Sequence, residues 1–373
     1  MARPKIICLI EHLDRGGEEK LVCDLMPAFK AFGLEPWVVT FIPGALDEKI
    51  RQKGVAHICL DGRTKAGRIP ALMKIFRKLS PHIIHTRLFS AGFWGRPAAL
   101  LSGRAACVHT HAGETFGEKK WKRLPVERIL TGVTHRIVCV STSVKDHLVN
   151  IGGLPEKKIS VIPNAIDTTP FESIAPRKIG LPARLITVGR LARVKGQDIL
   201  LRALPYLGDS VAEVVVCGDG PEGPNLRRLA SELQVSSKVT FLGARDDIPG
   251  LLARSDLFVA PSRSEGLPVA VLEAMAAARP VVATAVGGTC DVLRGVGWLA
   301  PPRDPEALAH EIKSALASPA TVHQKTKAAR DRVKRLYGFN SMVTAYLKLY
   351  ADCSPGLNRY LQSGGMAGVR DWT

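Results

Sequence analysis

Apolar runs rich in valine and isoleucine alternate with amphipathic stretches of helical length along most of this 373-residue chain. Such alternation is typical of βαβ units, in which helices cover a parallel sheet. In the first half, the pattern predicts strands at Lys5–Ile10, Pro36–Phe41, Ala56–Leu60, His82–Thr86, Ala105–Thr110 and Arg136–Val140. It predicts helices between several of these strands, at Glu18–Phe32, Ala71–Leu79, Ala91–Leu101 and Thr142–Ile151.

The pattern breaks near the middle of the chain and then starts again. A stretch with several prolines and no clear period runs from Ile162 to Pro182, so we expect a linker there. The strands expected after it are Arg184–Val188, Ala212–Cys217, Lys238–Leu242, Asp256–Ala260 and Pro280–Ala283. The expected helices include Gly196–Leu204, Gly223–Gln234, Val269–Ala277 and a long helical region over Asp304–Tyr350. The sequence therefore predicts an α/β protein with two doubly wound, Rossmann-like domains, which bind ligands at the carboxyl ends of their strands.

Composition and length exclude several classes of protein. Hydrophobic residues make up 46% of the chain, as in a globular protein. No apolar run reaches the roughly 18 residues of a membrane-spanning helix, and the apolar part of Met1–Ile10 is shorter than that of a signal peptide. None of the eight cysteines forms a CxxC pair, so buried thiols are a simpler interpretation than a metal or disulfide framework. We therefore expect a cytoplasmic protein.

The chain carries a large positive charge. The formal net charge is +18, and residues 1–170 contribute +11 of it, from 26 lysines and arginines against 15 aspartates and glutamates. Such a charge attracts nucleic acid, anionic lipid or phosphorylated substrates. One cluster sets a tryptophan among four cations: Lys119, Lys120, Trp121, Lys122 and Arg123. That mixture suits contact with an anionic membrane surface, although a solvated basic loop has the same composition.

Three segments that follow predicted strands directly have residues suited to phosphate binding. Gly16 and Gly17 lie between a strand and a helix, where backbone N–H groups favour an anion. Arg190 and Lys195 follow Arg184–Val188, and two such cations suit a diphosphate. Gly218 begins a Gly-Asp-Gly-Pro turn that leaves room for a nucleotide. Taken singly, each segment is equally well explained as an ordinary turn or as solvated surface charge.

A fourth segment, Ala260–Pro268, runs into a helix and has two carboxylates at helical spacing. Glu265 precedes the helix, and Glu273 lies about two turns into it, among apolar residues. Carboxylates in such surroundings accept hydrogen bonds from sugar hydroxyls. The backbone of Gly266 and Leu267, at the helix start, suits a phosphate. The alternative is one helix-terminal charge and one solvated glutamate.

The order of these motifs resembles that of the retaining glycosyltransferases of family 4. The motifs are GG-x-E, VIPN-x-ID, VGRL followed by KG, GDGP, F-x-G, PS-x-x-EG-x-P, LEAMA, and PVVAT followed by GG, within residues 6–350. The resemblance implies a GT-B fold with an acceptor-binding domain at residues 1–167 and a nucleotide-sugar-binding domain at residues 168–338. It further implies a helix at residues 339–353 that packs back on the first domain. We expect a loosely ordered tail at residues 354–373.

The resemblance also implies a role for each motif. Arg190 and Lys195 would bind the donor diphosphate, Glu265 the hydroxyls of the transferred sugar, and Glu273 the ribose. The remaining implied donor contacts are Gly16, Gly17, Gly218, Gly266, Leu267 and Pro268. The family usually has a histidine near the anomeric carbon, which His111 matches better than His109, although both remain open.

Two departures from the family pattern leave these implications intact. Ala165 and Leu267 stand where glycine and phenylalanine are common in the family. No Asp-x-Asp follows a predicted strand, so we expect no metal or cofactor, with cations and helix N-termini neutralising the leaving group instead.

The predicted function is transfer of a sugar from a nucleoside-diphosphate sugar to an acceptor hydroxyl, with retention of configuration. We expect a lipid-linked or saccharide acceptor in envelope polysaccharide, lipopolysaccharide or glycolipid synthesis, and peripheral contact with the inner face of the plasma membrane. A GT-B nucleotide-sugar epimerase or hydrolase is the main alternative. A nucleic-acid-binding protein is disfavoured, because no recognisable module or aromatic-rich basic stretch is present.

Overall fold

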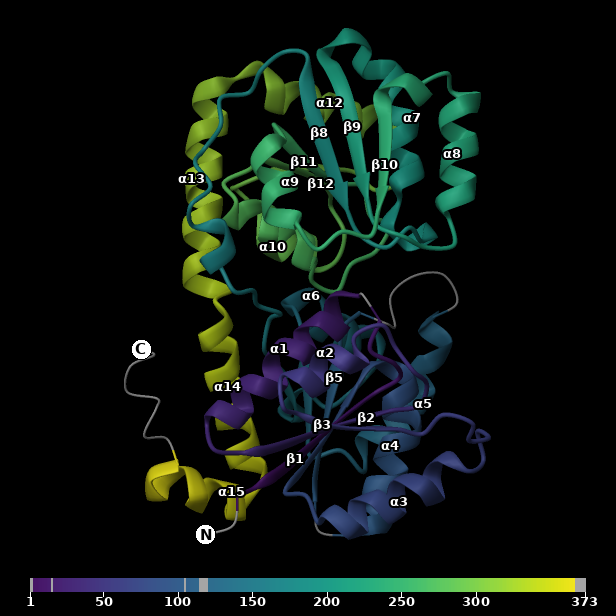
Figure 1. Ribbon diagram of the computed structural model, residues 1–373, viewed down its shortest axis with the longest axis vertical. Helices are drawn as coiled ribbons and strands as arrows, with labels where there is room; N and C mark the ends of the chain where they lie inside the picture. The colour runs from purple at the N-terminus through teal and green to yellow at the C-terminus, as the bar shows by residue number, and fades with distance from the viewer. Residues whose placement is uncertain (1–2, 15, 104, 114–119, 366–373) are drawn as a thin grey trace. The chain divides into compact units, whose positions relative to one another are not determined.

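The computed structural model describes residues 3–14, 16–103, 105–113 and 120–365, and its internal packing divides the chain into two units (Figure 1). Unit 1 comprises Met1–Asn164 and Asn340–Thr373, and unit 2 comprises Ala165–Phe339. Both units contain a parallel sheet with helical connections, which confirms the predicted fold class.

Unit 1 is built on a seven-stranded sheet of order β3-β2-β1-β4-β5-β6-β7. The strands are β1 (Lys5–Ile10), β2 (Glu35–Thr40), β3 (Ala56–Cys59), β4 (Ile83–Arg87), β5 (Ala106–His111), β6 (Arg136–Cys139) and β7 (Ile159–Val161). Its helices are α1 (Gly17–Ala31), α2 (Asp47–Gln52), α3 (Arg68–Leu79), α4 (Leu88–Ser102), α5 (Leu124–Thr131), α6 (Thr142–Asp146), α14 (Phe339–Cys353) and α15 (Pro355–Tyr360). The central strands are buried on both faces, which explains their continuous apolar runs.

Unit 2 is built on a six-stranded sheet of order β10-β9-β8-β11-β12-β13. The strands are β8 (Ala183–Val188), β9 (Val211–Cys217), β10 (Val239–Gly243), β11 (Leu257–Ala260), β12 (Val281–Thr284) and β13 (Trp298–Ala300). Its helices are α7 (Gln197–Leu207), α8 (Gly223–Glu232), α9 (Ile248–Arg254), α10 (Val269–Ala276), α11 (Gly288–Leu293), α12 (Pro305–Ala317) and α13 (Pro319–Leu336). The strand order reverses direction next to β8, so the loops after β8 and β11 lie at a switch point where α/β sheets bind ligands.

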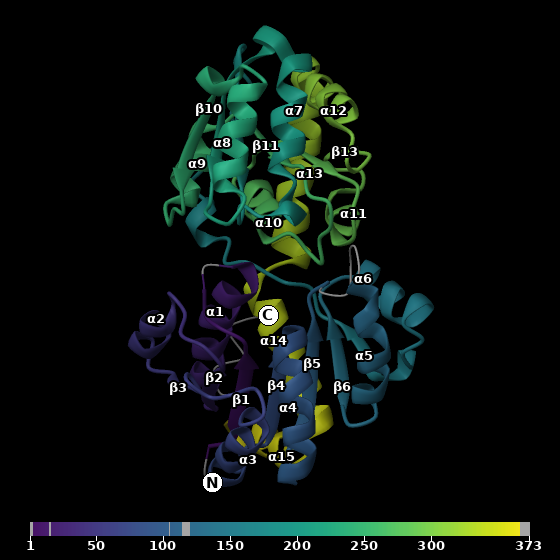
Figure 2. The ribbon, with the colours of Figure 1, turned by 90° about the vertical axis from the view of Figure 1, so that its right-hand side faces the viewer.

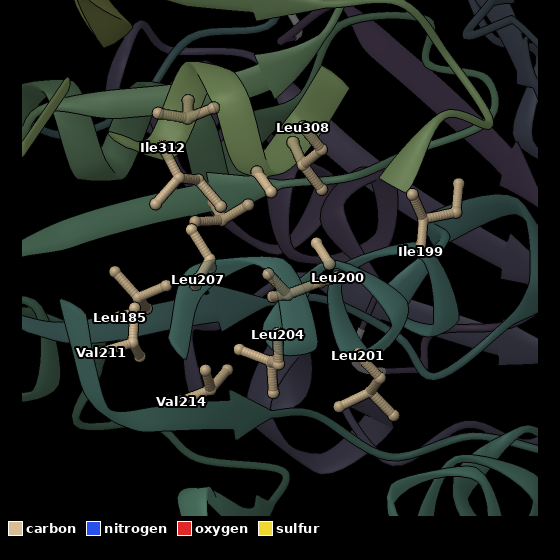
Figure 3. Packing of buried hydrophobic residues seen from close by; sticks show 14 of the residues in the cluster. Leu185, Ile199, Leu200, Leu201, Leu204, Leu207, Val211, Val214, Leu308 and Ile312 are labelled. Atoms are coloured by element: carbon tan, nitrogen blue, oxygen red, sulfur yellow. The ribbon is translucent and has the colours of Figure 1, made fainter. Parts of the chain in front are cut away.

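The core of unit 2 joins its sheet to α7 and α12, which lie side by side in Figure 2. Figure 3 shows Leu200 and Leu204 of α7 together with the strand residues Leu185 and Val214, all members of one buried cluster. Leu308 of α12 belongs to the same buried cluster. Full burial of each such side chain contributes about 1.5–3 kcal/mol. This packing fixes the helices on the sheet and so fixes the loops at its carboxyl edge.

Helix α14 belongs to unit 1 although it comes after unit 2 in the chain, and Figure 1 shows it in yellow beside the purple α1. Tyr346 and Tyr350 are fully buried. The Tyr350 hydroxyl lies 2.6 Å from Nδ1 of His85, and the ring of Phe29 packs edge-on against Tyr346. Helix α14 is therefore part of the core of unit 1.

Several elements differ from the sequence prediction. The long helical region forms three helices, because Pro319 starts α13 and Gly338 precedes α14. Residues Pro355–Tyr360 form α15 rather than the loosely ordered segment that we expected, since the Ser354 hydroxyl caps the helix through the N–H of Leu357. Residues 366–373 of that expected tail lie outside the described residues.

The expected linker is held to unit 2 by two arginines. Arg330 of α13 donates hydrogen bonds to the carbonyls of Phe171, Glu172 and Ile174 at 2.8–3.1 Å. Arg279, which is almost fully buried, donates to the carbonyl of Ala175. The segment has no hydrophobic period because its backbone is irregular. Arginine side chains of unit 2 nevertheless hold that backbone in place.

Candidate functional site

The most distinctive polar pair of unit 2 is Lys195 with Glu265. Lys195 ends the short turn Arg193–Lys195 after β8, and Glu265 lies between β11 and α10. The ammonium Nζ is 2.7 and 2.9 Å from the two carboxylate oxygens. The Glu265 side chain is 9% exposed and that of Lys195 is 32% exposed. The pair therefore presents one accessible cation and one sheltered carboxylate at the carboxyl edge of the sheet.

The segment that carries Glu265 is fixed by hydrogen bonds from neighbouring elements. The Ser262 hydroxyl donates to Oε1 of Glu265 at 2.6 Å. The Thr284 hydroxyl, at the end of β12, donates to the carbonyl of Ser262. The N–H of Gly288 donates to the carbonyl of Glu265 at 3.3 Å. A preorganised carboxylate of this kind binds a hydroxyl without first having to be ordered.

Two glycines allow the loops after β8, β9 and β11 to meet. Gly218 has φ = +140°, and a Cβ there would lie 2.0 Å from the carbonyl oxygen of Gly189. Gly196 has φ = +66°, and a Cβ there would lie 2.0 Å from the carbonyl oxygen of Pro261. Larger residues cannot fit at either position without moving backbone. Gly218 thus contributes by close packing of the loops, a role that the sequence motif does not specify.

The other donor residues predicted in unit 2 differ in their exposure. Arg190 is exposed just after β8, and its carbonyl accepts a hydrogen bond from Gln197 Nε2 at 3.2 Å. Gly266, Leu267 and Pro268 are buried directly after Glu265. Glu273 is half-buried within α10.

A cavity of about 20 Å³ borders the pair and is lined in part by Thr187, Gln197 and Ser262. Its volume is enough for one water molecule. A sugar or a phosphate is far larger than this cavity, so it would have to contact Lys195 and Glu265 from outside. The pair can offer a cation to an anionic group and a carboxylate to a hydroxyl at the same time.

In unit 1, the predicted glycine loop begins helix α1, and the residue after it is anchored in the core. Gly16 is the N-cap and Gly17 the first residue of α1. The Glu18 carboxylate accepts hydrogen bonds from Arg87 at 2.7 and 3.1 Å and from Asn164 Nδ2 at 2.8 Å. Burial alone lowers the pKa of the Arg87 guanidinium, but the Glu18 carboxylate reverses this effect and holds it well above its usual value. No local sequence pattern links Glu18 to Arg87, so this pair was not predicted.

His111 is the last residue of β5 and is fully buried. Its Nε2 lies 3.1 Å from Oε2 of Glu127 on α5, and Arg96 of α4 donates to the same oxygen at 2.6 Å. His109 lies two residues earlier on the same strand, and the two rings pack edge-on with centroids 4.6 Å apart. The sequence pattern indicates the two histidines but not Arg96 and Glu127, since α5 is a short helix that the pattern does not predict.

His109 has a different environment from that of His111. Its Nδ1 lies 2.8 Å from the Thr86 hydroxyl and 3.1 Å from the Thr86 carbonyl oxygen. Burial, together with the nearby Arg96 charge, lowers the pKa of His109 well below its usual value. His109 is therefore a neutral core histidine, whereas His111 is at the carboxyl end of the strand, where α/β sheets place functional groups.

The predicted membrane-contact cluster is described only in part. Lys119 lies outside the described residues, and only the backbone of Lys120 and Trp121 is described. Lys122 is exposed, while the Arg123 guanidinium lies 4.5 Å from the centre of the Phe89 ring. Within the parts of the chain that the structure describes, no helix combines the length and apolar character needed to cross a membrane.

Comparison with known proteins places most of the chain within two family models. Residues 15–170 match the model described as Glycosyltransferase Family 4, and residues 182–318 match Glycosyl transferases group 1. A galactosyltransferase of Escherichia coli that acts on α-D-GlcNAc-diphosphoundecaprenol is 30% identical over 266 residues, which are 65% of this chain and 68% of that protein. The glycogen synthase of Mycobacterium tuberculosis is 30% identical over 280 residues, 74% of this chain and 67% of that protein.

Solved structures agree with the fold. Anabaena HepE in complex with UDP and glucose superposes with a TM-score of 0.82 at 21% identity, covering 94% of this chain and 100% of that one. A sucrose-phosphate synthase from Thermosynechococcus elongatus superposes with a TM-score of 0.79 at 21% identity, covering 94% of this chain and 99% of that one. The two parallel sheets of this chain, one in each unit, therefore have the GT-B architecture.

Proposed function

Since this chain belongs to glycosyltransferase family 4, whose enzymes transfer sugars from nucleotide sugars with retention, we propose that its acceptor is a lipid-linked saccharide or glycolipid of the cell envelope. The relatives support this acceptor class. Besides the galactosyltransferase that acts on a diphosphoundecaprenol, they include a mannosyltransferase of Mycobacterium tuberculosis that acts on a phosphatidylinositol monomannoside, 32% identical over 248 residues.

The observation that carries the donor assignment is the Lys195–Glu265 pair. In our proposal, the donor diphosphate binds Lys195 and Arg190, and the transferred sugar binds Glu265 through its hydroxyls. The sugar displaces the Lys195 ammonium from the Glu265 carboxylate. The ammonium is then paired with the diphosphate, and the carboxylate accepts hydrogen bonds from the sugar hydroxyls. Glu273 binds the ribose, and Gly266, Leu267, Pro268 and Gly218 shape the surrounding loops.

The catalytic contribution of these residues is electrostatic. Negative charge develops on the departing nucleoside diphosphate as the glycosidic bond breaks. Fixed cations at that position stabilise the transition state more than the ground state, because the charge on the bridging oxygen grows along the reaction. Arg190 and Lys195 supply that charge without a metal ion, so transfer should persist in the presence of EDTA. We also propose Gly16 and Gly17 as contacts of the diphosphate, and His111 as a contact of the sugar near the reacting carbon.

Positive charge in unit 1 supports a membrane-associated acceptor. We assign Lys119, Lys120, Trp121 and Lys122 to contact with anionic headgroups on the inner face of the plasma membrane. Arg123 is better placed to hold this segment on α4, because its guanidinium covers the Phe89 ring. A lipid-linked acceptor would then be delivered in the plane of the membrane to which the enzyme is bound.

Two measurements test the proposed function. A thermal-shift screen against UDP-, GDP- and ADP-sugars identifies the donor, since a ligand at 100 times its dissociation constant adds about 2.7 kcal/mol to stability. With that donor, transfer to undecaprenyl-linked saccharides is compared with transfer to soluble glucans. Incorporation of sugar only into the glucan would contradict the proposed acceptor class. Release of free or epimerised sugar without any transfer would favour the epimerase or hydrolase alternative.

A further inference from the structure

Three ionisable side chains meet in the core of unit 1, where α4, β5 and α5 pack together (Figure 2). Arg96, His111 and Glu127 are all fully buried. A single carboxylate oxygen, Oε2 of Glu127, lies 2.6 Å from Arg96 Nη2 and 3.1 Å from His111 Nε2. The Arg96 Nε donates in turn to the carbonyl of Gly92 at 3.1 Å. Arg96 is therefore fixed to its own helix and holds the carboxylate against the histidine ring.

The charge state of Glu127 follows from these contacts. Burial raises the pKa of the Glu127 carboxyl, but His111 and Arg96 outweigh it through charge and hydrogen bonds and lower it to about 2. The group is therefore a carboxylate at neutral pH and can only accept hydrogen bonds. A contact between Nε2 of His111 and a carboxylate oxygen consequently requires the proton to be on Nε2.

We infer that Glu127 is a positioning residue, which holds the His111 ring in a fixed orientation and in the Nε2–H form at the carboxyl end of β5. This inference rests on the proposed function, in which His111 contacts the donor sugar. Arg96 supports this role, because it orients the Glu127 carboxylate and keeps it charged. Removing a carboxylate that sets the tautomer of a reacting histidine lowers turnover, because the wrong nitrogen then carries the proton.

The same side chains also have the ligand types of a metal site. The potential ligand atoms of His109, His111 and Glu127 lie within 4.8 Å of one another. The Arg96 guanidinium, however, already donates to Glu127 Oε2, so a divalent cation bound to this carboxylate would lie beside a fixed positive charge. An acid–base cluster fits the donor set better than a metal centre does.

The direct test is the protonation state of His111 in the wild-type protein. Selective ¹⁵N labelling of the ten histidines gives the Nδ1 and Nε2 signals, and His111 is assigned by the signals lost in His111→Gln. We expect Nε2 to be protonated throughout the accessible pH range. A His111 ring with its proton on Nδ1 and a bare Nε2 would overturn the inference, and this measurement needs no change at Glu127.

The Glu127 variants add a functional readout. In Glu127→Gln, the loss of the carboxylate should move any limb of the kcat–pH profile that reports His111 to lower pH. It should lower kcat by about 10²-fold with little change in the donor KM, the scale of one positioned acid–base group. Glu127→Asp, which keeps the charge, should restore part of the rate. The matched control is Glu156→Gln, an exposed carboxylate of unit 1 that pairs with Lys145 at the surface.

These measurements separate the failure of the inference from the failure of the proposed function. Wild-type turnover in His111→Gln would contradict the role of His111 in transfer, whatever the state of its ring. An unchanged kcat–pH profile in a folded Glu127→Gln would overturn the positioning role of Glu127. Zn²⁺ added to the metal-free protein should leave the His109 and His111 signals in place. A stoichiometric shift of both would show a metal site and overturn the inference.

Discussion

Glu265 and Lys195 form an ion pair in the free protein. In our proposal, each of them exchanges this partner for a group of the donor. We predict that Glu265→Gln lowers turnover more than donor affinity, because the amide keeps the shape but loses the charged acceptor for the sugar hydroxyls.

Glu273→Gln should instead weaken binding of the nucleoside part. Calorimetry with free nucleoside diphosphate distinguishes the two. Wild-type affinity in Glu273→Gln would remove the ribose assignment.

Because Glu127 is buried and its pKa is lowered, the free energy of unfolding should depend on pH. Its folded pKa of about 2 lies below the ordinary value of 4.5, so its contribution is fully present above pH 4.5 and is lost as the pH falls toward 2. The difference in unfolding free energy between wild type and Glu127→Gln should be on the order of 3 kcal/mol at neutral pH. Urea unfolding between pH 7 and 3.5 should show this difference shrink below pH 4.5. A difference that does not change with pH would contradict the assigned charge state.

At the level of elements, the proposed donor site depends on how closely three loops approach one another at one sheet edge. Gly218→Ala would place a methyl group 2.0 Å from the Gly189 carbonyl oxygen at a φ of +140°. We expect a loss of stability of about 1–3 kcal/mol and weaker donor binding, because the loop after β9 has to move. Gly180→Ala is the control, since a Cβ there has no atom within 4 Å. Equal melting temperatures and donor affinities in the two variants would contradict this role of Gly218.

The sequence predicted elements best where the apolar runs were long. Strands such as β1 and β9 were found because buried parallel strands are continuously apolar. The three-residue strands β7 and β13 were missed, because three residues carry no measurable period. The break between α12 and α13 was also missed, although the Ser318-Pro319 signal was present in the chain.

Candidate site residues could be proposed from the sequence where a motif places them at the end of a strand. Lys195 and Glu265 were identified separately, but their pairing follows only from the adjacency of β8 and β11 in the sheet. Arg96 and Glu127 are 31 residues apart on two helices. No local pattern predicts such a pair, because the contact exists only after both helices have packed on β5.

At the scale of the whole molecule, the net charge of +18 predicts association with anionic surfaces. We expect the protein to sediment with vesicles containing anionic lipid and not with neutral ones. Binding should weaken as salt rises, because each lysine or arginine near the surface contributes about 1 kcal/mol within a Debye length.

Changing Lys119, Lys120 and Lys122 to glutamine should release the protein from anionic vesicles. Changing Lys65, Lys74 and Lys78 to glutamine removes the same charge from another part of unit 1 and is the control. No vesicle binding at low salt would contradict the membrane proposal. Equal loss in both triple variants would show that the overall charge, rather than this segment, is responsible.

The central claim is that the Lys195–Glu265 edge of unit 2 binds the donor diphosphate, and titration calorimetry with UDP, GDP and ADP tests it most directly. One nucleoside diphosphate should bind wild type, and it should bind Lys195→Ala and Arg190→Ala more weakly. In transfer from the matching nucleotide sugar, each variant should lose about 2–4 kcal/mol of transition-state stabilisation, the scale for one preorganised charge partner. Arg193→Ala, which removes an exposed cation from the same turn, should bind as wild type does. Undiminished binding of that nucleotide by Lys195→Ala would contradict the account.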